Sequence, residues 1–152
     1  LGECLGGALY TEDFRRMMHQ LGWADVRTVT ESPIEVTDPV LRRQLGNAQF
    51  VSRTIRAFKL PDVIEDICED YGQVAPYRGG IEGMEHAFVL DDHHTFEAGR
   101  PMLVCGNTAA MLQKTRFTPA FDVLGDRSTH FGAFDCAPTD ADATSSTLAR
   151  CC

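Results

Sequence analysis

The chain has 152 residues, of which 43% are hydrophobic and 24% are charged, and its formal net charge is −8. This length and composition fit one globular domain with its own hydrophobic core. The negative charge argues against a nucleic-acid partner, which requires a concentrated basic surface. The sequence contains neither a run of about 18 apolar residues nor a signal-peptide pattern. We therefore expect no membrane partner and predict a cytoplasmic location.

The first half of the chain alternates between helical and extended patterns. Residues 11–21 carry apolar side chains at helical spacing, with Thr11 as the expected N-cap and Met17 and Met18 on the expected buried face. The β-branched residues of 23–30 predict a strand.

Proline placement marks the next helix. Thr37 or Asp38 is expected to cap a helix that has Pro39 in its first turn and ends before Gly46. Residues 49–60 then predict a strand with both faces partly covered.

The second half is predicted to contain shorter elements. We expect one or two helical turns at 62–72, an edge strand at 73–80, strands at 86–90 and 95–105, a helix at 106–117 capped by Asn107 or Thr108, and short extended pieces at 117–126 and 130–135. Repeated strand–helix units are absent. The predicted class is therefore α+β, with a largely antiparallel sheet, a few flanking helices and a flexible C-terminal tail.

Two charged clusters have alternative interpretations. Arginines at 42, 43, 53 and 56 are interspersed with acidic residues, which favours a solvated face over a nucleic-acid surface. The segment 91–94, Asp-Asp-His-His, has groups that bind zinc, but adjacent strand residues point to opposite faces. A polar turn between two strands is the favoured interpretation, so no metal site is assigned there.

Six cysteines are present, at positions 4, 68, 105, 136, 151 and 152. Their wide, irregular spacing and the lack of a C-x-x-C pair argue against a disulfide framework or a structural zinc site. Cys68 and Cys105 lie in apolar stretches and are expected in the core.

The remaining candidates lie near the two ends of the chain. Cys4 is followed by Gly6 and Gly7, which leave its thiol uncrowded, so it could be a nucleophile, a soft-metal ligand or an inert side chain. Adjacent Cys151 and Cys152 could chelate a soft ion or be incidental to an exposed tail.

Several long motifs carry a family resemblance. GECLGGALYTEDF, GWADVRTVTESPI, QLGNAQFVSRTIRAFKL, FVLDDHHTFEAGRPMLVCGNTAAML and a terminal Cys-Cys pair are found in this order. The chain resembles the C-terminal half of arsenite methyltransferases from Gly2 to about Phe121. These enzymes methylate trivalent arsenic with S-adenosylmethionine.

The resemblance implies a role for Cys4 as one arsenic-binding thiolate. It implies an arsenic-binding region at residues 1–136 and a Cys-ending tail at 137–152, with Cys151 and Cys152 as possible accessory thiols. S-adenosylmethionine is expected on the enzyme's N-terminal methyl-donor domain, outside this chain, so no catalytic residue and no cofactor are assigned within it.

The expected partners are arsenite or thiol-conjugated trivalent arsenic, a thiol reductant such as glutathione or thioredoxin, and the methyl-donor domain itself. The alternative is a non-catalytic, thiol-rich module in which Cys4, Cys151 and Cys152 sequester arsenite or soft metal ions.

Overall fold

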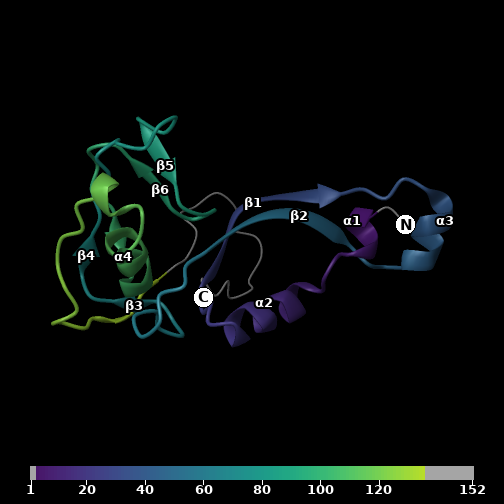
Figure 1. Cartoon of the computed structure of the whole chain (residues 1–152), viewed down its shortest axis with the longest axis horizontal. Coiled ribbons are helices and arrows are strands. Elements are labelled where there is room, and N and C mark those ends of the chain that lie inside the picture. Colours follow the sequence, from purple (N-terminus) through teal and green to yellow (C-terminus); the bar gives the residue numbers. More distant parts are fainter. Residues whose placement is uncertain (1–2, 136–152) are drawn as a thin grey trace.

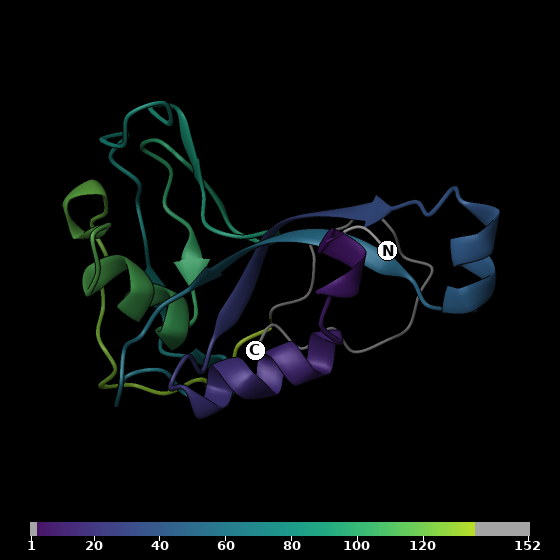
Figure 2. The same cartoon turned by 45° about the vertical axis from the view of Figure 1, so that its right-hand side comes forward.

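A computed structural model describes residues 3–135, with side chains from Leu5 onward. The chain forms a long two-stranded hairpin that extends from a more compact body (Figure 1). Three helices accompany the hairpin, namely α1 (Glu3–Gly6), α2 (Thr11–Gln20) and α3 (Pro39–Leu45). Figure 2 shows α3 at the far end of the hairpin, away from the body.

The hairpin pairs β1 (Val26–Ile34) with β2 (Phe50–Ala57) in antiparallel register, from Val26 opposite Ala57 to Ile34 opposite Phe50. Both strands were predicted, but β1 begins three residues later than expected and runs four residues further. The expectation that both faces of the second strand are partly covered is wrong for residues 51–54, which are exposed. Coverage begins at Ile55, where the hairpin enters the body.

The cap of α3 follows the prediction. The Asp38 carboxylate accepts hydrogen bonds from the backbone N–H groups of Val40 and Leu41, at 2.8 and 2.9 Å. Pro39 occupies the first turn, and Gly46 ends the helix at φ 61°. Local chemistry alone therefore determines where this helix begins and ends.

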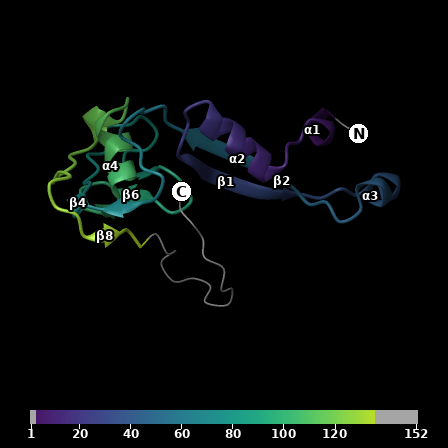
Figure 3. The same cartoon turned by 90° about the horizontal axis from the view of Figure 1, so that it is seen from below.

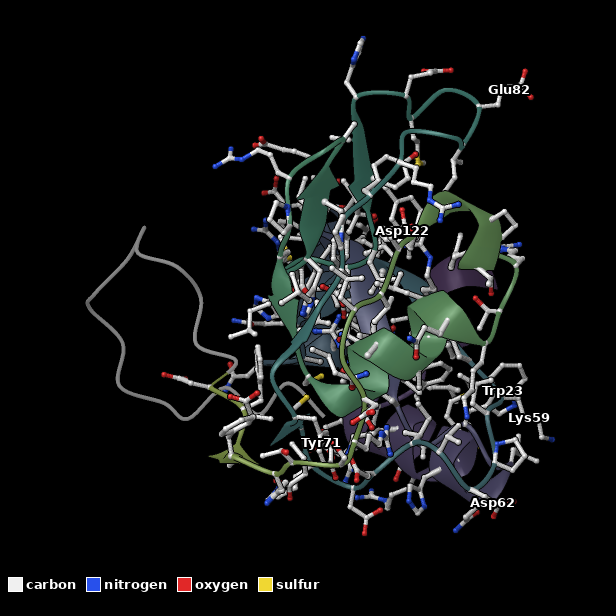
Figure 4. The ribbon with its side chains drawn as sticks, turned by 90° about the vertical axis from the view of Figure 1, so that its left-hand side faces the viewer. Trp23, Lys59, Asp62, Tyr71, Glu82 and Asp122 are labelled. Carbon is white, nitrogen blue, oxygen red and sulfur yellow. The ribbon has the colours of Figure 1, made fainter. Side chains whose placement is uncertain are left out.

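Helix α2 forms where expected but is not a core helix. Its N-cap is Tyr10 and not Thr11, and none of its residues is buried. Met17 is 41% exposed, and Leu21, just after the helix, is 63% exposed. The core assignment of Met17 and Met18 is therefore wrong: Met17 is exposed and Met18 is only half-buried. Shortly after α2, Trp23 forms a cation–π contact with Lys59, whose Nζ lies 5.9 Å from the centre of the Trp23 ring (Figure 4).

The body surrounds α4 (Gly106–Gln113), of which the first seven residues are buried. Three further antiparallel pairs enclose it: β3 (Glu69–Asp70) with β8 (Gly132–Ala133), β4 (Gln73–Val74) with β7 (Leu103–Val104), and β5 (Ala87–Val89) with β6 (Thr95–Glu97). A short 3₁₀ turn spans Thr118–Ala120. The α+β class with antiparallel pairing is confirmed, as four separate two-stranded sheets among the described residues.

Aromatic side chains dominate the core of the body. Tyr77, Phe88, Phe96 and Phe121 form a connected set whose ring centres lie 5.0–5.9 Å apart. Phe58, directly after β2, enters the same core and contacts Phe117 at 6.0 Å. The hairpin is thus anchored to the body by burial of an aromatic ring.

Several local predictions for the body are wrong. The strand expected at 73–80 forms only at β4, the helix expected at 106–117 ends at Gln113, and the 3₁₀ turn lies in a piece expected to be extended. Residues 62–72 form turns, with β3 inside them, and no helix; Asp62 takes a positive φ of 66°, which a helix does not allow (Figure 4). The N-cap of α4 is Cys105, whose sulfur accepts from the N–H of Thr108 at 3.4 Å, and not Asn107 or Thr108.

The predicted tail at 137–152, with Cys151 and Cys152, lies outside the described residues, as does Cys136. Within residues 3–135, no helix has both the length and the apolar character needed to cross a bilayer.

Candidate functional site

The Cys4 motif folds as a short helix at the edge of the molecule. Cys4 lies in α1, and a side chain built at Gly6 would meet no atom within 4 Å. Leu9 and Tyr10, which follow the glycines, are 58% and 67% exposed. The described residues therefore leave Gly6 uncrowded and the segment after it exposed.

The other described cysteines lie elsewhere. Cys68 and Cys105 are 7% and 0% exposed, which confirms their predicted burial. They belong to the body around β3 and α4, whereas α1 lies beside the hairpin, and this separation is visible from two directions (Figures 1 and 3). The structure therefore does not bring α1, which carries Cys4, next to these two buried thiols.

The most densely connected polar group of the body centres on Arg27, at the start of β1. Its guanidinium donates to both carboxylate oxygens of Asp25, at 2.8 and 2.9 Å. It also donates to Asp91 at 2.8 Å and to the hydroxyl of Thr108 at 3.0 Å. His94 Nδ1 lies 2.7 Å from Asp91 and 3.4 Å from the Arg27 guanidinium. All five side chains are nearly or fully buried.

We call this cluster the Arg27 network: Asp25, Arg27, Asp91, His94, Asn107 and Thr108. Within it, electrostatics favour the charged forms of Arg27 and Asp91. Burial disfavours the Arg27 charge, but the carboxylates of Asp25 and Asp91 outweigh it and raise the Arg27 pKa well above its ordinary value. Burial likewise raises the pKa of Asp91. His94 and Arg27 overcome that effect and hold the Asp91 pKa well below the usual range.

The Arg27 network is the junction between hairpin and body. It joins β1, the turn between β5 and β6, and the first turn of α4, since Asn107 Nδ2 also donates to Asp25 at 3.4 Å. The predicted polar turn at 91–94 is confirmed as the β5–β6 connection, but Asp91 and His94 are buried members of a network. Sequence reasoning missed the pair of Asp25 and Arg27, because the other partners of Arg27, Asp91 and Thr108, lie 64 and 81 residues away.

The described part of the chain holds no group of three His, Cys, Asp or Glu side chains placed to bind a metal ion. Asp92 and His93, which extend the Asp-His run, lie on the outer side of the turn, where their side chains are 49% and 35% exposed. The chemistry of the Arg27 network is therefore charge compensation and not metal coordination.

Comparisons with known proteins agree with each other. The sequence model of the arsenite methyltransferase C-terminal domain matches residues 71–148, just over half of the chain. An arsenite methyltransferase from Aquipseudomonas alcaligenes is 52% identical over 155 residues, covering 99% of this chain and 44% of the relative. The mouse enzyme is 41% identical over 120 residues, covering 79% of this chain and 31% of the relative.

The fold is similar to a solved structure as well. The crystal structure of an arsenic(III) S-adenosylmethionine methyltransferase from Chlamydomonas reinhardtii superposes with a TM-score of 0.85 at 51% identity, covering 89% of this chain and 45% of that one. The chain thus spans less than half the length of these relatives. It belongs to the family of arsenite methyltransferase C-terminal domains.

Proposed function

We propose that this chain is the C-terminal part of an S-adenosylmethionine-dependent arsenite methyltransferase, and that Cys4 supplies one of the thiolates that hold trivalent arsenic. Family membership is the observation that carries the proposal. The open surroundings of Gly6 and the exposure of Leu9 and Tyr10 support it, because an arsenic–thiol adduct needs access from outside.

The chemistry of arsenic explains why several thiolates are needed. Trivalent arsenic is a soft centre that binds three sulfur atoms in a pyramid, which leaves its lone pair as the nucleophile toward an electrophilic methyl group. Cys4 supplies one sulfur, and Cys68 and Cys105 are buried in the body. We therefore assign the remaining sulfurs to other parts of the longer enzyme or to a small thiol such as glutathione, which also acts as a reductant.

The described residues do not fit a site for S-adenosylmethionine. A Rossmann-type donor site requires parallel strands joined by helical crossovers. All four strand pairs described are antiparallel. We therefore place the methyl donor on a preceding domain and derive no step through it from this chain.

Arsenite titration of the chain tests the role of Cys4. With accessible thiols counted after each addition, we expect weak binding that protects one thiol per arsenic and is lost in Cys4→Ser. The matched control is the double variant Cys151→Ser, Cys152→Ser, which should bind arsenite like the unaltered chain. Tight binding of three thiols per arsenic that requires the two terminal cysteines would contradict the proposal and favour a sequestering module.

Methylation by a longer enzyme provides the second test. In a full-length protein that contains this chain, we expect Cys4→Ser to abolish arsenite methylation while S-adenosylmethionine still binds. A Cys4→Ser enzyme that methylates arsenite at the original rate would show that this thiolate is not a ligand.

A further inference from the structure

A hollow of about 280 Å³ opens on the surface of the body, on the side where β2 joins it. Its walls come from the end of β2, the loop before β5, β5 itself and the segment after α4. The lining residues are Arg56, Ile81, Met84, Phe88, Arg116 and Phe117. The hollow therefore combines two guanidinium groups with an apolar and aromatic surface.

Arg56 is held in place without a carboxylate partner. Its guanidinium donates to the backbone carbonyl oxygen of Val89 at 2.7 Å and to that of Leu90. It also lies 5.3 Å from the centre of the Phe88 ring and 5.8 Å from that of Phe117. Among the side chains of residues 5–135 no carboxylate forms an ion pair with it. Arg56 therefore differs from the solvated face expected for the arginine cluster, because it is half-buried and positioned.

Arg116 brings a second positive charge to the same ring. Its guanidinium carbon lies 5.1 Å from the centre of the Phe117 ring, and the described carboxylates form no ion pair with it either. Burial, and after it the charge of Arg116, lowers the pKa of Arg56. The guanidinium groups of Arg56 and Arg116 thus both lie near the Phe117 ring, and their positive charges repel each other.

The described carboxylates form no ion pair with either arginine, although the charge of Asp91 partly offsets that of Arg56. Glu82 belongs to the loop between Ile81 and Met84, but its side chain points away from the body (Figure 4). Asp122 is engaged by Arg78, and Asp91 is hydrogen-bonded to Arg27. In a chain with a formal net charge of −8, a hollow lined by two guanidinium groups that have no ion pair among the described residues is an unusual surface.

We propose that this hollow binds a small organic anion, with a carboxylate on the guanidinium groups of Arg56 and Arg116 and an apolar or aromatic body against Met84, Phe88 and Phe117. Guanidinium groups match the geometry of carboxylates and form charge-assisted hydrogen bonds with them. A bound anion removes the repulsion between the two arginines, and the ring surface buries the apolar part. Benzoate is a suitable probe, because it joins one carboxylate to one aromatic ring.

Titration of the chain with benzoate tests the site, followed by NMR through the arginine Nε–Hε signals. We expect the signals of Arg56 and Arg116 to shift in a saturable way, while the neutral amide benzamide causes no comparable shift. Arg116→Gln should weaken benzoate binding roughly tenfold or more, as loss of a charged hydrogen bond predicts. Arg116 is exposed, so this variant is expected to fold.

Control variants distinguish binding in the hollow from a general attraction of anions to positive charge. Arg43, on α3, is exposed and has no ion pair among the described residues, so Arg43→Gln makes the same charge change without touching the hollow and should leave benzoate binding unchanged. Cys4→Ser should also leave it unchanged, because the site is independent of arsenic binding. Equal binding of benzamide, or an equal loss of benzoate binding in Arg43→Gln and Arg116→Gln, would overturn the proposal.

Discussion

Charge compensation around Arg27 illustrates how single residues stabilise this domain. Arg27 is 5% exposed and contacts the carboxylates of Asp25 and Asp91, residues that are 1% and 2% exposed. Removing one partner from such a buried cluster leaves an uncompensated charge, which costs far more than an exposed ion pair contributes. Asp91 is the member that joins the hairpin to the β5–β6 turn.

Asp91→Asn is therefore expected to lower the free energy of unfolding by about 3 kcal/mol at pH 7. The folded Asp91 has a lowered pKa, so its charge stabilises the fold fully above the unfolded value of about 4, and this contribution is lost as the pH falls further. The difference between the two proteins should thus shrink below about pH 4.

Urea unfolding at pH 7, 4 and 3 measures both effects. The matched control is Asp92→Asn, because Asp92 is the neighbouring residue and its side chain is 49% exposed. A constant difference across these pH values, or an equal cost for Asp92→Asn, would contradict this account of Asp91.

Site residues were predictable from the sequence only where their chemistry is local. Cys4 stays a prediction, which the adjacent glycines and the family resemblance both suggested. Arg27 was not predicted as a site residue, because its strand-like sequence gives no sign that Asp91 is its partner. Arg56 was grouped with exposed arginines, and only the packing of Phe88 and Phe117 separates it from them.

At the scale of elements, the turns before β5 depend on glycines in different ways. Gly79 and Gly83 both have positive φ, of 81° and 76°. A Cβ at Gly79 would lie 2.6 Å from the backbone oxygen of Glu85, whereas one at Gly83 would meet nothing within 4 Å. Comparing an alanine substitution at Gly79 with one at Gly83 therefore distinguishes the cost of a steric clash from the cost of backbone strain alone.

We expect Gly83→Ala to cost about 1 kcal/mol of unfolding free energy, from the left-handed backbone alone. Gly79→Ala should cost roughly 2 kcal/mol more, because the carbonyl of Glu85 must move. Thermal and urea unfolding of the two variants would measure the difference, and equal costs would show that the loop relaxes freely.

Elements with local signals were predicted well, and those that depend on distant partners were not. The Asp38–Pro39 pair identified the start of α3. The helix expected at 62–72 does not form, because contacts with distant residues hold this segment in another conformation. For example, the backbone N–H of Glu65 donates to the Asn107 side chain at 2.8 Å. The periodicity of α2 predicted the helix but not whether a neighbour covers Met17.

At the scale of the whole molecule, apolar burial is concentrated in the body. Leu112, on α4, is 0% exposed, whereas Leu21, just after α2, is 63% exposed. The same substitution at the two positions therefore compares the two regions directly. Leu112→Ala should lower the free energy of unfolding by about 2–5 kcal/mol, and Leu21→Ala by less than about 0.5 kcal/mol.

Urea unfolding followed by circular dichroism checks this contrast. A large cost for Leu21→Ala would mean that α2 contributes apolar packing to the fold of this chain, contrary to its exposed face in the structure.

The position of Phe58 has a consequence for how the domain can be divided. The family match begins at residue 71, yet Phe58 belongs to the core of the body, and Arg27 compensates Asp91 from within β1. A fragment cut at residue 71 would lose one core ring and leave the Asp91 carboxylate without its guanidinium. The smallest unit that can be excised or exchanged between relatives therefore starts upstream of Asp25, and Asp25, Arg27 and Asp91 must be transferred together.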